Sequence, residues 1–242
     1  MRLNLKLSVL AGATALLIGA STSVFAITPE VFVQITVEKH CAKCQLPKVD
    51  FSGFDLSKVN LQHSDLQAAN LEGANLQHSD FTGANLSNAN LKGANLSGAK
   101  LDGADLSGCD LAGANLSQTS LHKTNFSKAK LHLAQLQGAV GEQVDFRQAD
   151  LISAQAERAQ LKGADFRGAK LYWTRFDLAD LSNSRFEQTT VEEVSFPGAQ
   201  LKGANFSDAH LIAPALHGTR LTGVVWTTGK TCKKGSIGFC QK

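Results

Sequence analysis

The sequence predicts an all-β solenoid, in which short strands alternate with tight turns and the chain winds into square coils. The prediction rests on a five-residue apolar period, on glycines at a fixed place within that period, and on aromatic residues that recur every 20 positions. Neither the two-residue alternation of a long strand nor the 3.6-residue period of a helix describes this pattern.

The five-residue period runs without a slip through residues 51–226. Of 36 consecutive central positions, only Gly141 and Ala156 are not large and apolar. The residue two places before each centre is small or β-branched, with Phe54 and Pro214 as bulky exceptions. Alternate residues of a strand share one face, so we expect both positions to point into a common core.

Glycine recurs two residues after the centre, where a tight turn often needs a positive φ. The clearest examples are Gly73, Gly83, Gly93 and Gly103. Each five-residue unit is therefore expected to consist of a short strand followed by a corner.

Aromatic residues give the number of units in one coil. They occupy central positions 20 residues apart, which are Phe126, Phe146, Phe166, Phe186, Phe206 and Trp226. Large core side chains pack well above one another in successive coils, so this spacing predicts four units per coil. With the usual interstrand spacing of about 4.8 Å, about nine coils would form a rod on the order of 45 Å long.

The repeat unit resembles that of the pentapeptide-repeat family. The family's consensus A-(D/N)-L-x-x is matched by Ala74-Asn75-Leu76 and by Ala104-Asp105-Leu106, and the resemblance covers about 180 of the 242 residues. It implies a right-handed quadrilateral β-helix. It implies little about activity, because the fold is a scaffold for many functions. Some members are DNA-mimicking regulators of topoisomerase, which present an acidic rod as a dimer.

The first 26 residues have the features of a secretory signal peptide. Arg2 and Lys6 precede an uncharged apolar run at residues 7–20, and Val24-Phe25-Ala26 ends the segment with a site that a signal peptidase reads. The apolar run is short for a membrane span of about 20 residues, and no cysteine follows to carry a lipid. We therefore expect cleavage after Ala26 and an exported bacterial protein, periplasmic or secreted, without membrane insertion.

The mature chain divides into a cap at residues 27–43, the β-helix at residues 44–228 and a second cap at residues 229–242. Open solenoid ends need such covers. Thr28 followed by Pro29 is typical of a helix start, which would lead into residues 31–40. The alternating valines and isoleucine in the same segment equally fit a capping strand.

Cysteines mark both ends of the predicted rod. Cys109 falls at an inward position and is interpreted as a small buried residue, which leaves Cys41 to pair with Cys44 and Cys232 with Cys240. The two pairs lie too far apart to exchange partners. The Cys41 and Cys44 motif could instead be redox-active, or bind a metal with nearby His40. No thioredoxin-like context and no fourth ligand accompany it, so a structural role is favoured.

The polar residues show no pattern of catalytic chemistry. The histidines do not align at multiples of 20, and the carboxylates recur as part of the repeat, where we expect them to accept hydrogen bonds from turn amides. We predict no enzyme activity, no metal and no cofactor. The formal charge of +3 falls to +1 without Arg2 and Lys6, which predicts no long-range attraction to nucleic acid or anionic lipid.

One side of the predicted rod departs from the polar surface pattern. Its outward positions carry the candidate interaction patch, which consists of Leu133, Ile152, Tyr172, Trp173 and Ile212. Clustered apolar side chains on a soluble surface often mark a contact site. The sequence thus favours an exported, non-enzymatic structural or protein-interaction scaffold, with an unknown partner or self-association. A topoisomerase regulator is disfavoured by the leader and the near-neutral charge, and a CxxC redox protein is a weaker alternative.

Overall fold

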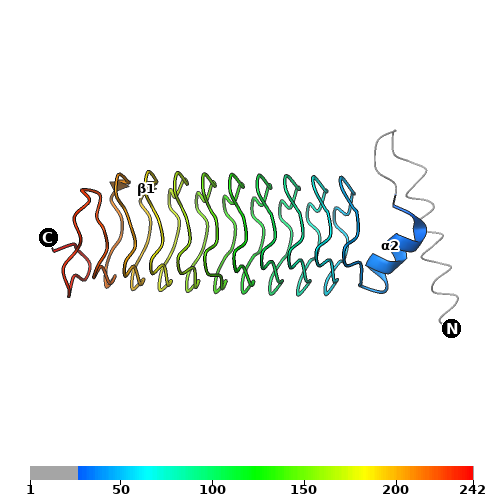
Figure 1. The fold of residues 1–242 in the computed structure, drawn as a ribbon, viewed down its shortest axis with the longest axis horizontal. Coiled ribbons are helices and arrows are strands. Elements are labelled where there is room, and N and C mark those ends of the chain that lie inside the picture. The colour runs from blue at the N-terminus through cyan, green and yellow to red at the C-terminus, as the bar shows by residue number, and fades with distance from the viewer. Residues whose placement is uncertain (1–26, 242) are drawn as a thin grey trace.

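A computed structural model describes residues 27–241 of the chain. Residues 1–26, where the sequence predicts the signal peptide, and Lys242 lie outside the described part. The described chain forms an elongated rod of stacked coils, with helix α2 (Pro29–Thr36) at one end and the C terminus at the other (Figure 1).

The coils are joined by parallel bridges between residues 20 positions apart. These bridges run from His40 paired with Asn60 to Asn205 paired with Val225. Four pentapeptides therefore complete one coil, as the spacing of the aromatic residues predicts. Most bridges involve only the single residue before the centre, because each side of the square is too short for a longer strand.

On one side of the rod, two segments of the described chain are long enough to form strands. Strand β1 (Thr190–Glu192) pairs in parallel with strand β2 (His210–Ile212), with Thr190 opposite His210. Both lie on the side whose central positions include Leu131, Leu151 and Leu171.

The corners are tight turns with a left-handed third residue. The carbonyl of Phe51, for example, accepts a hydrogen bond from the N–H of Phe54 at 3.1 Å. The intervening Gly53 has a φ of 68°, which agrees with the predicted role of glycine. Lysine at the same position also adopts it, as at Lys58 with a φ of 59°. The tertiary fold thus imposes this conformation on non-glycine residues, at a cost of about 1 kcal/mol or more for each.

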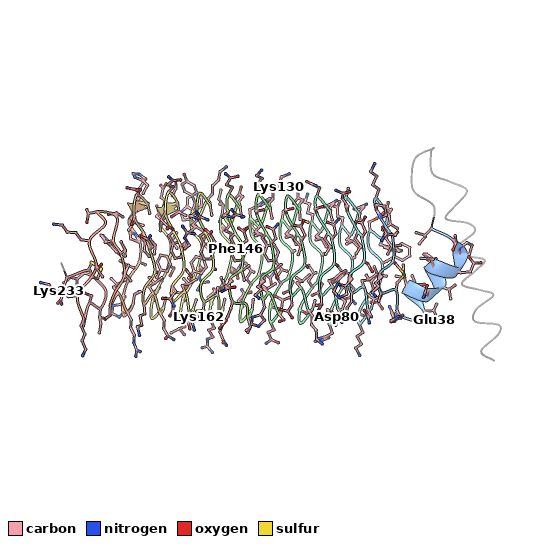
Figure 2. The ribbon with its side chains drawn as sticks, in the orientation of Figure 1. Glu38, Asp80, Lys130, Phe146, Lys162 and Lys233 are labelled. Atoms are coloured by element: carbon pink, nitrogen blue, oxygen red, sulfur yellow. A yellow bond between two sulfur atoms is a disulfide. The ribbon has the colours of Figure 1, made fainter. Side chains whose placement is uncertain are left out.

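The core consists of the central side chains and the small residues two places before them, which are buried along nearly the whole rod. The aromatic column is a stack of nearly parallel rings. Phe186 lies 4.9 Å from Phe166 and 4.4 Å from Phe206 between ring centroids, with interplanar angles of 7° and 1°. The predicted stacking is confirmed from Phe126 to Phe206 (Figure 2 labels Phe146 of this column), whereas the Trp226 ring is tilted by 46° relative to Phe206.

The N-terminal cap is a helix, which decides between the two structures that the sequence left open. The Thr28 hydroxyl accepts a hydrogen bond from the Val31 N–H at 3.5 Å, and Pro29 occupies the first turn, where its missing N–H costs nothing. Val33 and Ile35 of the helix are buried, and Ile35 belongs to the same core cluster as the coils.

Phe54, a bulky exception in the repeat, packs against this helix. Phe32 of α2 lies edge to face with Phe54, at 5.8 Å between ring centroids, and Phe54 also contacts Phe51. A small residue at position 54 would leave a gap under the cap. The exception in the repeat thus reflects contact with the helix.

The ladder begins before the expected boundary at residue 44. His40 already pairs with Asn60, and the Cys41 N–H donates to the Asn60 carbonyl at 2.7 Å. Cys41 therefore occupies a central position of the first coil. The cap that precedes the β-helix is correspondingly shorter than residues 27–43.

The C-terminal end is covered by a chain reversal. Arg220 pairs with Ile237 and Val225 with Thr231, both in antiparallel orientation. The reversal gives the last coil hydrogen-bond partners that a further coil would otherwise supply, which protects the open edge.

Candidate functional site

The most distinctive surface of the rod is an apolar group on one side, which we call the side patch. It consists of Leu133, Ile152, Tyr172 and Trp173 on three successive coils. Leu133 is 57% exposed and Trp173 is 55% exposed, whereas Ile152 and Tyr172 are half-buried. Backbone hydrogen bonds hold the coils in register, since the Leu133 N–H donates to the Ile152 carbonyl at 3.0 Å.

The fifth residue of the expected patch is separated from the other four. Strand β1 places Glu192, followed by Glu193, between the coil of Trp173 and the coil of Ile212. The Trp173 Nε1–H donates to Glu193 Oε2 at 3.0 Å, so this carboxylate forms one border of the side patch. Ile212 is 38% exposed and lies beyond that acidic border.

Sequence reasoning missed four exposed apolar residues elsewhere, one of which is Val37, 46% exposed just after helix α2. Leu178 occupies the next corner along the chain and is 56% exposed, while Ile237 and Phe239 in the C-terminal cap are 56% and 63% exposed. Leu178 could have been found, because it occupies the outward position that is usually glycine. The two cap residues lie outside the repeat, so no period indicates their orientation.

A polar groove runs along another corner, between coils that carry arginines. Ser127, Lys128, Gln148 and Gln188 line it together with Arg147, Arg167 and Gly168. Each arginine pairs with the aspartate two residues earlier, at 2.6 Å for both Arg147 with Asp145 and Arg167 with Asp165.

These ion pairs lie within single coils. Partial burial of Asp165 acts to raise its pKa, but hydrogen bonds from Arg167 outweigh this effect and hold the pKa below the usual value. Asp165 is thus ionised and bound to Arg167 at neutral pH. The groove supplies no free carboxylate for acid or base chemistry.

The histidines and acids do not assemble a metal centre within residues 27–241. No group of three or more His, Cys, Asp or Glu side chains there has the geometry to hold a metal ion. Neither does any helix in the described chain have the length and apolar character needed to cross a membrane.

Both predicted cysteine pairs are disulfides in the structure. Cys41 is joined to Cys44 across the first corner, and Cys232 is joined to Cys240 in the C-terminal cap. The Cys41 side chain is only 1% exposed because it fills a central core position. Such burial shields this sulfur from an attacking thiol, which supports the structural role.

Comparison with protein families accounts for the repeat. A model described as pentapeptide repeats matches residues 40–73, 69–108, 104–140 and 145–183, and a second pentapeptide-repeat model matches residues 166–210. The chain belongs to the pentapeptide-repeat family. Members of this family form right-handed β-helices, which agrees with the ladder of bridges 20 residues apart. No curated protein is found that matches the chain as a relative.

Solved structures of pentapeptide-repeat proteins are similar to the chain. HetL, involved in heterocyst differentiation regulation in the cyanobacterium Nostoc sp. strain PCC 7120, is 26% identical with a TM-score of 0.48, over 85% of this chain and 98% of HetL. QnrB1, a plasmid-mediated fluoroquinolone resistance protein, is 22% identical with a TM-score of 0.45, over 76% of this chain and 89% of QnrB1. A pentapeptide-repeat protein of the Arabidopsis thaliana thylakoid lumen is 27% identical with a TM-score of 0.33, over 49% of this chain and 68% of that protein.

The pentapeptide repeat explains most of the carboxylates. Asp50 Oδ1 accepts hydrogen bonds from the Ser52 N–H at 2.9 Å and from the Asn70 side-chain amide at 3.0 Å. The same contact with the amide two residues later recurs at many coils, as it does at Asp65 and Asp105. These acids hold corners and neighbouring coils together, as the sequence predicts.

We expect Cys109 to be inert toward alkylation in the folded pentapeptide-repeat rod. Its side chain is fully buried, its thiol donates to the Leu86 carbonyl at 2.9 Å, and burial raises its pKa to about 12. Iodoacetamide at pH 8 should therefore modify no thiol in the native protein and one thiol per chain in denaturant without reductant. Rapid modification of the native protein would contradict the buried position.

Proposed function

We propose that the chain is an exported, non-enzymatic scaffold of about nine coils that makes protein contacts through the side patch. The observation that carries the proposal is the exposure of Leu133 and Trp173 on a rod whose other outward positions are mostly polar. An aromatic anchor among aliphatic neighbours is typical of the centre of a protein interface.

Two features support the other parts of the proposal. The basic start and apolar run of residues 1–26 favour export. The repeat carboxylates are engaged in corner hydrogen bonds, and the core is filled with side chains, so the described rod offers no enclosed catalytic cleft.

We propose a second copy of the chain as the partner of the side patch. Asp150 and Lys170 are bridged neighbours on the same wall of the rod. Consider a twofold axis that lies in the plane of this wall, perpendicular to the long axis of the rod, between the coils of Leu151 and Leu171. This axis would place Asp150 of each copy opposite Lys170 of the other. The same axis brings Tyr172 against Ile152, so this wall of the rod is complementary to itself in charge and in apolar character.

Light scattering tests this proposal. The purified protein is expected to have twice the mass of a variant that carries Tyr172→Ser and Trp173→Ser. Leu178→Ser is the matched control, because it removes an equally exposed apolar side chain from a different corner and should leave the dimer intact.

A charge exchange tests the orientation of the two copies. Asp150→Lys alone and Lys170→Asp alone should each weaken the dimer, because both place like charges opposite one another, while the double variant should restore it. A wild-type protein that remains monomeric at hundreds of micromolar would overturn self-association. A dimer left unchanged by the combined Tyr172→Ser and Trp173→Ser substitutions and by each single charge substitution would place the contact elsewhere.

A further inference from the structure

The charge of the chain is divided unevenly along the rod. Residues 27–208 carry 17 Lys and Arg against 21 Asp and Glu, whereas residues 209–242 carry five Lys and Arg and no Asp or Glu. The near-neutral total therefore hides a basic C-terminal end. The expectation of no attraction to anionic surfaces follows from the total charge and takes no account of this uneven distribution.

Three of these cations lie together in the C-terminal cap. Lys230, Lys233 and Lys234 are all exposed, and none of them forms an ion pair with a described residue. Figure 2 shows Lys233 at the extreme end of the rod, opposite to the helix α2. The nearest acidic residue in the sequence is Asp208, one full coil before the cap.

Two large apolar side chains are exposed in the same loop. Ile237 is 56% exposed and Phe239 is 63% exposed, which makes Phe239 the most exposed of the large hydrophobic residues in the described chain. Ser236 between them and the core is fully buried. Ile237 and Phe239 flank Gly238, whose φ of 73° bends the chain, and both side chains are exposed to solvent within this short loop.

The backbone of the loop is fixed, so these side chains cannot simply fold back into the core. The Ser236 carbonyl accepts a hydrogen bond from the Leu221 N–H at 2.9 Å, and the Gly238 N–H donates to the Thr219 carbonyl at 3.0 Å. The Cys232–Cys240 disulfide closes the loop around them. The result is a preformed surface of two apolar residues beside three lysines, which we call the basic tip.

We propose that the basic tip binds the surface of an anionic lipid bilayer, with Ile237 and Phe239 inserted among the headgroups and the lysines held near lipid phosphates. Apolar side chains beside unpaired lysines are the chemistry that binds such an interface, since each contribution alone is weak and the two act together. A long lysine side chain also reaches back to the headgroups while a neighbouring ring is buried. The rod would then stand on the membrane by its C-terminal end.

This orientation is compatible with the side patch but independent of it. The side patch lies on a wall of the rod, several coils before the tip, so a protein contact there leaves Ile237 and Phe239 free. The lysines would also attract a nucleic acid, but the aliphatic side chain of Ile237 gives a nucleic acid no group to bind. The apolar pair therefore favours lipid over nucleic acid.

Vesicle sedimentation tests the proposal. The purified chain is mixed with sucrose-loaded vesicles of phosphatidylcholine that contain about 30% phosphatidylglycerol, and with vesicles of phosphatidylcholine alone. We expect the protein to sediment with the anionic vesicles at low salt and to be released by 0.5 M NaCl, because screening weakens the attraction of the lysines.

Variants of the tip assign the binding to its residues. A Lys233→Gln and Lys234→Gln variant should bind about 30-fold more weakly, from a contribution of about 1 kcal/mol for each lysine. Ile237→Ser with Phe239→Ser should lower binding at least tenfold. All the proteins share the same N-terminal residues, so differences between them report on the tip.

Matched controls separate the tip from the rest of the rod. Lys162→Gln with Lys202→Gln removes two exposed lysines from the body, and Leu178→Ser removes an apolar side chain as exposed as Ile237. Both should bind like the wild type, and all variants should keep the wild-type thermal midpoint. Absence of binding to anionic vesicles, or equal losses in tip and control variants, would overturn the proposal. Tighter binding to a DNA duplex that is insensitive to Ile237→Ser with Phe239→Ser would also overturn it.

Discussion

Replacing Phe186 with alanine is expected to lower the free energy of unfolding by about 4 kcal/mol. Phe186 is fully buried and stacks on Phe166 and Phe206, and it also meets Phe196 edge to face at 6.4 Å between ring centroids. Removal of a buried phenyl group costs about 3–5 kcal/mol through lost burial and the remaining cavity. The column cannot close the gap, because the coils above and below are held at the spacing of the backbone ladder.

Urea denaturation followed by circular dichroism measures this loss, and hydrogen exchange localises it. The Phe186 N–H donates to the Asn205 carbonyl at 2.7 Å, so we expect its protection to fall more than that of amides near Leu86. Phe186→Leu is the control, because leucine occupies the same wall at earlier coils, and it should cost only about 1 kcal/mol. An equal loss in both variants would show that ring stacking and volume do not limit stability here.

Replacing Gly141 with leucine is expected to destabilise the protein by about 3 kcal/mol, although leucine is the usual residue at a central position. A Cβ atom at Gly141 would lie 2.8 Å from the backbone carbon of Leu121 and 2.7 Å from Val144 Cγ2. Atoms this close must move apart, and overpacking of a core typically costs about 1–3 kcal/mol. A whole leucine side chain adds to the clash that the first carbon already makes.

Thermal and urea denaturation of Gly141→Ala and Gly141→Leu test this expectation as a graded pair. Alanine should lower the stability and leucine should lower it further, because the second substitution adds volume in the same closed space. Gly103→Ala is the matched control. No atom lies within 4 Å of a Cβ at Gly103, whose φ is 66°, so only backbone strain of about 1 kcal/mol is expected there. A Gly141→Leu protein more stable than the wild type would show that the repeat pattern outweighs the local packing.

The residues that face the core could be predicted, because their pattern is encoded locally in the sequence. An apolar residue at every fifth position has no other way to reach a common core, and aromatic residues 20 apart stack only if four units form one coil. Phe126, Phe146 and Phe166 do stack in this way, at 5.3 Å and 5.0 Å between successive ring centroids. The corner glycines were predicted for the same reason, since a tight turn requires a positive φ at one place.

The arrangement of the residues that face solvent could be predicted only in part. The sequence indicates which positions face solvent, and so it indicated Leu133 and Trp173. It does not indicate which neighbours surround them, and Glu193 proved to bind the Trp173 indole and border the side patch. Arg147 likewise pairs with Asp145 on its own coil, because the two side chains flank the same central residue.

By itself, the sequence determined the repeat, the number of units in a coil, the inward residues and the cysteine pairs, since each depends on spacing along the chain. The tertiary structure alone decided that residues 29–36 form a helix, that the ladder begins at His40, and that Gly141 has no room for a side chain. It also decided that Ile237 and Phe239 project from the basic tip. These features depend on which atoms of distant coils lie nearby, and at the two ends of a solenoid no repeated neighbour exists from which that environment can be inferred.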